Sequence, residues 1–544
     1  MSAMKISIRP VVSHEPIVRA MAHFILASSV LVVLFAGLFP FDFDFPRTGF
    51  WSTVRSKFDT SPEPPLVQDR IQNLLFFVPF GFGVGAALRP RSKRRAVAAR
   101  LTVALMLGAA LSLTIEVLQV FLGFRDPTWS DVVMNTLGAV VGAGVAVAFG
   151  QEILETVARP LARLRPYATL PVVTTLLVLY TAAQFAIPFR AGNRGLLDNW
   201  DVSFPLLVGN ETVGERGWPG RVWQLDLASR AASAEEAAAI HAAGNARGVL
   251  ADALLGSYEL LGDGPYADVT GQLKPLTWTR PPEPADEFTA PATRPGAPPT
   301  SQPAHLTLDR WLRTPTAIAP ATHKVRQTSQ FTFVATVAPD ETFLPGGPAR
   351  IASISGGVTR RNFSAMHERR DLVLRLRTPL LGDDGSAPEA LVDDVFESTD
   401  KRQIVVTYRD PLMVVYVDGA ERGRLEITPE AEFIWRFYPR PRWKVRLGQY
   451  GFRSYALVYR LLVFIPFAAL LAAATALSRT TPRAQFVIAG AAIAGVAVVL
   501  ELIMGRMTAS GFQPRNLIIS LVIASVSFAL MRVRRSRTPP LARA

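Results

Sequence analysis

Repeated apolar runs constrain this chain more than any other feature of its sequence. An α-helix needs about 20 apolar residues to cross the hydrocarbon core of a bilayer. We predict eight such spans, at residues 21–41, 71–88, 101–122, 131–149, 168–188, 455–477, 485–504 and 515–532. The sequence therefore predicts a polytopic α-helical membrane protein of about eight transmembrane helices rather than one soluble domain.

Basic residues gather in every second loop between these spans. The net charge of +14 would suggest a nucleic-acid partner in a soluble protein, but here the basic residues lie in short tracts beside apolar runs, as in 89–100. Such tracts are typical of the cytoplasmic side of a membrane protein. We therefore expect the lipid bilayer and not nucleic acid as a partner, both termini in the cytoplasm, and residues 190–450 outside. The first run is too long for a signal peptide, so we expect a retained anchor.

The region between spans five and six has a different pattern. Apolar and polar residues alternate at 331–337, 349–354, 372–376, 403–408 and 413–417. Turn signals separate them at 346–347, 356–357, 383–385 and 418–419, which favours a β-sandwich. We expect a helix over 232–244 and an exposed loop over the Pro-rich stretch 281–303.

Polar side chains interrupt spans two, three and four near their predicted outer ends. Charged groups at such depth cost roughly 2.5–3.5 kcal/mol each on insertion scales, so they are seldom accidental. We expect them to converge on the outer leaflet side and to form a polar cup. Its members are Asp69, Arg70, Asn73, Glu116, Gln119, Arg125, Asp131 and Asn135.

The polar cup has a functional and a structural interpretation. Glu116 is a candidate acid or base, because a buried carboxyl group needs a partner or a raised pKa. The amides equally suit hydrogen bonds that hold helices together, and Asp131 suits an N-terminal cap. Gly138 and Gly142 form a small-xxx-small pair, for which close helix packing is the preferred interpretation.

Short segments of the first four spans recur in the last four. NLLFFVPFG at 73–81 is echoed by RLLVFIPFA at 460–468, and Glu501 precedes Asn516 by the same fifteen residues that separate Glu116 from Asp131. Ser520 then stands at the place of Asn135. We interpret this as a tandem duplication of a four-helix unit, in which the second copy lost most of the polar chemistry.

The first four spans resemble the VanZ family, small bacterial membrane proteins associated with resistance to glycopeptide antibiotics. The resemblance covers about residues 20–150 and rests on DRIQNLLFFVPFGFGVG, IEVLQVFLGFRDPTWSD and DVVMNTLGAVVGAGV. It is fainter in spans five to eight. It implies an architecture and a cell-envelope setting but no defined reaction.

Residues 190–450 resemble the concanavalin A-like and laminin-G-like sandwiches, through ARIASISGG, RNFSAMHERRDLVLRLRT and QIVVTYRDPLMVVYVDG. Such domains often bind calcium, for which Asp383, Asp384, Asp393 and Asp394 are available; a solvated acidic loop is the simpler interpretation. The tryptophans suit either a carbohydrate platform or a sandwich core. These are Trp200, Trp218, Trp223, Trp278 and Trp311.

The sequence shows no recognised catalytic motif. The six histidines are scattered without metal-ligand spacing, there is no phosphate-binding or nucleophile-elbow motif, and the absence of cysteine excludes disulfides and thiolate catalysis. Our leading hypothesis is an envelope protein whose outer domain binds a glycan, a lipid-linked cell-wall precursor or a protein. The alternatives are a membrane enzyme or transporter that uses Glu116 as acid or base, and a non-catalytic scaffold.

We expect four segments. They are a four-helix membrane unit at 1–150, a linker with the fifth span at 151–189, the sandwich at 190–450, and three spans with a basic tail at 451–544.

Overall fold

A computed structural model gives the fold of this chain. It describes residues 15–39, 41, 43, 45–46, 48–59, 67–88, 93–122, 127–191, 195–279, 302–436, 443–447 and 453–536. The chain forms two compact units, residues 1–176 and residues 177–544.

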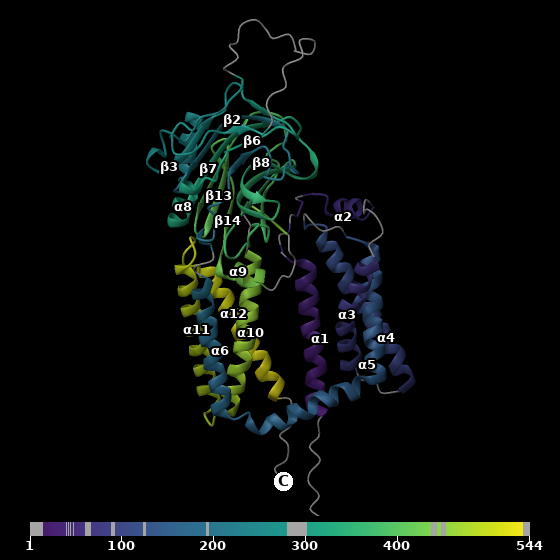
Figure 1. The fold of residues 1–544 in the computed structure, drawn as a ribbon. Coiled ribbons are helices and arrows are strands. Elements are labelled where there is room, and N and C mark those ends of the chain that lie inside the picture. Colours follow the sequence, from purple (N-terminus) through teal and green to yellow (C-terminus); the bar gives the residue numbers. More distant parts are fainter. Residues whose placement is uncertain are drawn as a thin grey trace, which may run out of the picture. The chain divides into compact units, whose positions relative to one another are not determined.

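The first unit is a bundle of helices (Figure 1). Its helices are α1 (Glu15–Leu38), α2 (Phe50–Asp59), α3 (Val67–Ala87), α4 (Lys93–Gln119) and α5 (Trp129–Leu164), followed by the 3₁₀ turn η1 (Arg165–Tyr167). Buried apolar side chains of α1, α3, α4 and α5 form one core. The short helix α2, which the sequence analysis did not predict, packs through Val54 against Val120 and Phe121 at the end of α4.

Glycines allow α3 and α5 to lie in close contact. A methyl group on Gly138 would lie 2.1 Å from the carbonyl oxygen of Leu74, and one on Gly142 would lie 2.0 Å from that of Val78. Both distances are far inside van der Waals contact, so a side chain at either position would push the helices apart. The interpretation of these glycines as packing residues is confirmed.

Seven of the described helices are long and apolar enough to cross a membrane: α1, α4, α5, α6, α10, α11 and α12. The predicted span at 71–88 forms the 21-residue helix α3 but is not among these seven. Its first two turns are polar, which lowers its mean hydropathy. The predicted fourth span at 131–149 lies within α5, which continues to Leu164 before the chain turns.

The second unit contains the remaining long helices and the β domain. The helices α6 (Leu170–Ala191, which begins in the first unit), α10 (Arg453–Leu477), α11 (Pro482–Arg506) and α12 (Pro514–Ser536) form its apolar part. The Tyr180 hydroxyl on α6 donates to the carbonyl oxygen of Val463 on α10 over 2.9 Å, which ties these two helices together.

The β domain is built from two facing sheets (Figure 1). One sheet has the strand order β15-β11-β10-β9-β8-β1-β6-β4, and the other has the order β14-β13-β12-β7-β2-β3 with β5 paired to β2. The strands are β1 (Leu206–Val208), β2 (Gly220–Ala228), β3 (Leu254–Glu259), β4 (Thr277–Trp278), β5 (Ala304–Leu306), β6 (Leu312–Arg313), β7 (Gln330–Pro339), β8 (Leu344–Gly357), β9 (Arg360–Arg369), β10 (Asp371–Leu376), β11 (Glu389–Val392), β12 (Arg402–Arg409), β13 (Leu412–Val417), β14 (Ala420–Glu426) and β15 (Lys444–Arg446). The predicted β-sandwich is confirmed.

Aromatic side chains join the two sheets. Phe331 on β7 lies 5.2 Å from Phe363 on β9, measured between ring centroids, and Phe333 lies 5.1 Å from the same ring. Trp200 and Trp218 are fully buried, so two of the five tryptophans belong to the core and the five do not form one carbohydrate platform.

All five predicted strands form, in β7, β8, β10, β12 and β13. The predicted turn at 418–419 joins β13 to β14, with Asp418 and Gly419 both at positive φ. The predicted turn at 346–347 is wrong, because these glycines lie inside β8, where the pairing with β9 shifts register between Leu344 and Ala349. A glycine pair marks a bulge there, not a chain reversal.

The Ala-rich helix is also confirmed as α7 (Ala234–Ala243). Ser233 and Glu236 form a capping box at its start, and Gly244 ends it in the left-handed conformation. The other short helices are η2 (Ala251–Ala253), α8 (Ala319–Thr328) and α9 (Pro429–Arg436). Most of the predicted Pro-rich loop, residues 281–301, lies outside the described residues.

Buried charges cluster beside β8, β9 and β10. Arg375 pairs with Glu389 over 2.5 Å, and Arg350 lies 3.7 Å from Glu211. Arg361 is 0% exposed, and none of its three guanidinium nitrogens has a hydrogen-bond partner in the described parts of the chain. Burial lowers the pKa of Arg361 to about 10 and that of Arg350 to about 9, because a charged group loses hydration there.

Candidate functional site

Glu116 joins the end of α4 to the beginning of α5. Its side chain is 2% exposed, and its Oε2 accepts the backbone N–H of Thr128 over 3.1 Å. Thr128 is the residue before α5, so its N–H has no acceptor within the helix. In a capping box, the side chain of the third helical residue accepts the N–H of the capping residue. Here the carboxylate of Glu116, on α4, accepts that N–H for α5.

Asp131 is paired across the bundle rather than used as the cap of α5. Its backbone N–H donates to the hydroxyl of Thr128, which makes Thr128 the cap. The prediction of Asp131 as an N-terminal cap is wrong, since the helix begins two residues earlier. Instead the Asn73 amide on α3 donates to Asp131 Oδ1 over 2.7 Å.

The two remaining amides of the polar cup also connect helices. The Gln119 amide donates to the carbonyl oxygen of Gly37 at the end of α1 over 2.7 Å. The Asn135 amide donates to the hydroxyl of Ser112 on α4 over 2.9 Å. Asn135 Oδ1 is buried and has no hydrogen-bond partner among the described residues. Both hydrogen bonds join two helices, as the structural interpretation of the amides predicts.

The remaining residues of the polar cup lie nearer its edge or cannot be placed. Asp69 is exposed and Arg70 is half-buried on the first turn of α3. Arg125 lies in 123–126, outside the described residues. The polar cup is therefore a set of contacts among α1, α3, α4 and α5, centred on Glu116, Asn73 and Asp131.

The same hydrogen bond recurs between α11 and α12. Glu501 is 3% exposed, and its Oε1 accepts the backbone N–H of Gln513 over 3.1 Å. Gln513 immediately precedes α12 and follows Glu501 by twelve residues, as Thr128 follows Glu116. Both carboxylates thus bind the N–H group that precedes the next long helix.

Arg460 lies beside Glu501 and occupies the position in segment 460–468 that Asn73 occupies in segment 73–81. Arg460 on α10 is 1% exposed and donates to Glu501 over 2.7 Å and to Glu430 on α9 over 3.1 Å. Its Nε donates to the backbone oxygen of Asn516 over 3.2 Å. One arginine between two carboxylates leaves a buried group with net negative charge.

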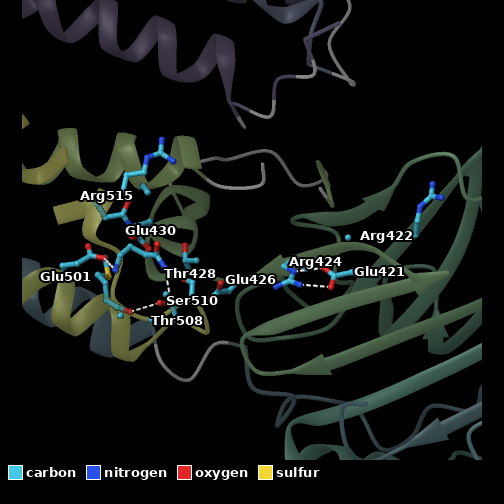
Figure 2. A pocket seen from close by; sticks show the side chains of 17 residues that line it. Glu421, Arg422, Arg424, Glu426, Thr428, Glu430, Glu501, Thr508, Ser510 and Arg515 are labelled. Carbon is cyan, nitrogen blue, oxygen red and sulfur yellow. Dashed lines mark hydrogen bonds and ion pairs between the residues drawn. The ribbon is translucent and has the colours of Figure 1, made fainter. Parts of the chain in front are cut away.

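A cavity of about 850 Å³ lies beside this group (Figure 2). The ends of α11 and α12 contribute Glu501, Met504 and Asn516 to its wall, and β14 contributes residues 421–424 and Glu426. A volume of this size is typical of small-molecule sites. The sequence analysis missed the cavity because its two walls are about eighty residues apart in the chain.

The carboxylates that line this cavity are already engaged. Arg424 pairs with Glu421 over 2.7 Å (Figure 2). Arg460 donates to Glu430 and to Glu501. Glu426 accepts the backbone N–H of Ala509, and burial raises its pKa above the usual range.

Two arginines on the cavity wall have no acidic partner. Arg515 makes no hydrogen bond or ion pair, and Arg422 bonds only to the backbone oxygen of Asp393, within the part of the chain that the structure describes. Because the lining acids are occupied, these two free guanidinium groups favour an anionic ligand.

Three of the four aspartates considered for calcium are held by other groups. Asp383 pairs with Arg377 and Asp393 with Arg446, while Asp384 accepts the N–H and hydroxyl of Ser386. Asp394 occupies a turn at positive φ. In the described residues no three His, Asp or Glu side chains gather closely enough to hold a metal ion.

The long apolar helices and the sandwich define a multi-pass membrane protein that carries a β domain. Comparison with protein families adds that the model of the VanZ/LLP1 family matches residues 13–150, which include α1 to α4, the first part of α5 and every residue of the polar cup. No curated protein matches the chain. No solved structure matches it either.

Proposed function

We propose that this is a bacterial cell-envelope protein whose last spans and β domain together bind the phosphate-bearing head group of a membrane lipid or lipid-linked precursor. The cavity of Figure 2 is the observation that supports this proposal. Its wall combines the ends of two membrane-length helices with an edge strand of the sandwich, so it is open to groups that lie at a membrane surface.

The charge pattern of the cavity supports a phosphate. Arg515 supplies planar donors that suit a phosphate, and Arg422 supplies others at the opposite end of the cavity (Figure 2). Glu421 is paired with Arg424, and Glu430 and Glu501 share Arg460, so these three carboxylates repel the anion less than unpaired carboxylates would. In the expected orientation this surface faces the outside of the inner membrane.

Binding of undecaprenyl phosphate and phosphatidylglycerol to the full chain in nanodiscs tests the proposal, with diacylglycerol as the uncharged probe. Arg515→Gln and Arg422→Gln should each weaken binding of the phosphate lipids about tenfold, the equivalent of one lost charge-assisted contact. Arg506→Gln is the matched control, because Arg506 ends α11 but does not line the cavity. Equal affinity of all three variants would contradict the proposal.

The alternative of an enzyme or transporter with Glu116 as acid or base makes a different prediction. The contact of Glu116 with Thr128 favours a positioning role, and glutamine can accept the same N–H. Glu116→Gln should therefore keep the fold, and loss of lipid-substrate turnover in proteoliposomes without loss of stability would favour chemistry at this carboxylate. A tolerant Glu116 together with a crosslinked stoichiometric partner would favour the scaffold.

We also infer that the two sets of long helices descend from one four-helix unit. The equal spacing of the Glu116–Thr128 and Glu501–Gln513 contacts supports this, as does the packing of α3 on α5 and of α10 on α12. An experimental structure in which α6 and α10–α12 do not superpose on α1 and α3–α5 would refute the duplication.

A further inference from the structure

A second cavity lies on the seven-stranded sheet, at the C-terminal end of α7. Its volume is about 420 Å³. The sheet contributes Trp223, Thr336 and Gln403 to its wall, and the β13–β14 turn contributes Asp418. The end of α7 and the residues after it complete the wall with His241, Ala243, Gly244 and Asn245.

Three polar side chains form a row across the floor of this cavity. Gln224 on β2 pairs in register with Thr336 on β7, and Thr336 pairs with Gln403 on β12. Residues paired in register on neighbouring strands point to the same face of a sheet. Gln224 is satisfied, since its amide donates to Asp226 and Ser257.

Two atoms of this row have no hydrogen-bond partner. Thr336 is 5% exposed and Gln403 is 4% exposed, and neither Thr336 Oγ1 nor Gln403 Oε1 bonds to any residue that the structure describes. A buried polar atom without a partner costs about 1–3 kcal/mol. Thr336 and Gln403 both line the cavity. Their partnerless oxygen atoms are complementary to a ligand that brings its own hydroxyl groups.

The two carboxylates at this cavity are paired with arginines. Asp418 accepts from Arg402 over 2.8 Å and from the backbone N–H of Gln403, and Glu259 pairs with Arg247. Lys401 has no acidic partner among the described residues, and its ammonium lies 5.1 Å from the centroid of the Trp223 ring. Paired carboxylates, a lysine over the indole ring and unpaired neutral atoms favour a hydroxyl-bearing ligand over a cationic one.

We propose that this cavity binds one neutral sugar residue of a glycan, with hydroxyl groups bonded to Thr336 Oγ1 and Gln403 Oε1. The volume suits one or two pyranose rings, and Trp223 supplies an apolar surface for a ring face. Of the three ligands considered for the outer domain from its sequence, this site suits the glycan, and it is independent of the lipid cavity.

Saturation-transfer NMR and isothermal titration of the full chain in detergent test this proposal, with oligomers of glucose, galactose, mannose and N-acetylglucosamine as probes. At least one probe should bind, and Thr336→Val should weaken that binding tenfold or more while the melting temperature stays equal or rises. Valine has nearly the shape of threonine, and the lost hydroxyl makes no bond within the described residues.

Thr332→Val is the matched control on the same strand. The Thr332 hydroxyl accepts from Ala232 N and donates to the Arg230 carbonyl oxygen, and Thr332 does not line the cavity. This variant should lower the melting temperature and leave the sugar affinity unchanged.

Three results would overturn the proposal: no binding of any neutral sugar, binding that Thr336→Val leaves intact, or stronger binding of uronic acids than of neutral sugars. Arg515→Gln should not change sugar binding, which separates failure of this site from failure of the lipid cavity.

Discussion

Arg361 and Arg375 belong to one buried cluster but are held there in different ways. Arg375 is matched by Glu389, whereas Arg361 makes no hydrogen bond or ion pair within the described residues and interacts with Asp384, Glu211 and Glu389 only at longer range. Removing one member of a buried ion pair is costly, because the remaining charge stays buried, whereas removing an unmatched charge is not.

The two substitutions should therefore change stability in opposite directions. Arg361→Met should raise the free energy of unfolding by about 1–2 kcal/mol, and Arg375→Met should lower it by about 3–5 kcal/mol. Denaturant titration of the full chain, followed by tryptophan fluorescence, measures both. The exposed neighbour Arg360 gives the control substitution Arg360→Met. Destabilisation by Arg361→Met would contradict this account of the cluster.

The burial of His367 makes the free energy of unfolding of the sandwich depend on pH. Its side chain is fully buried and accepts from Trp218 Nε1, and burial lowers its pKa from 6.5 to about 4. Between those two values the unfolded chain binds the proton and the folded chain does not, so protonation favours unfolding.

Stability attributable to His367 should fall as the pH falls from about 7 to 4, by about 3 kcal/mol in total. His367→Gln should remove this part of the pH dependence, and His323→Gln, on the exposed side of α8, should not. Parallel stability curves for wild type and His367→Gln across this range would contradict the assignment.

At the scale of elements, the contact between α3 and α5 depends on the absence of a side chain. Gly138→Ala should destabilise the first unit by about 1–3 kcal/mol, because the new methyl group meets the carbonyl oxygen of Leu74. Gly144→Ala on the same helix meets no atom within 4 Å and should be neutral or stabilise by up to about 1 kcal/mol. Thermal unfolding of the full chain in detergent separates the two; equal effects would argue against close packing here.

The sequence predicted elements where one local pattern decides the structure. The strands β7 and β12 alternate regularly, and Ser233, Glu236 and Gly244 specify both ends of α7, so these elements were found. The Gly346–Gly347 pair was mistaken for a turn, because a bulge and a turn use the same residue type.

The candidate sites were less predictable, because their contacts join distant segments. The pairing of Asn73 with Asp131 could be anticipated from polar residues on neighbouring spans. The network of Arg460 could not, since one of its acids, Glu430, comes from a helix between strands β14 and β15 of the sandwich. An arginine inside an apolar run was the only local signal of that network.

At the scale of the whole molecule, the absence of cysteine makes the topology directly testable. Lys324→Cys on the sandwich should react with a membrane-impermeant maleimide in intact spheroplasts. Thr480→Cys, between α10 and α11, should react only after the membrane is permeabilised. Both positions are exposed, so access depends on the side of the membrane. The opposite pattern would reverse the orientation inferred from the basic tracts.

The sandwich is attached to the long helices at more than its two chain ends. Glu430 on α9 reaches Arg460 inside α10, and Glu426 on β14 accepts the backbone N–H of Ala509 after α11. A tensile force applied to the sandwich would therefore act on an ion pair buried between α9, α10 and α11 as well as on the two chain connections.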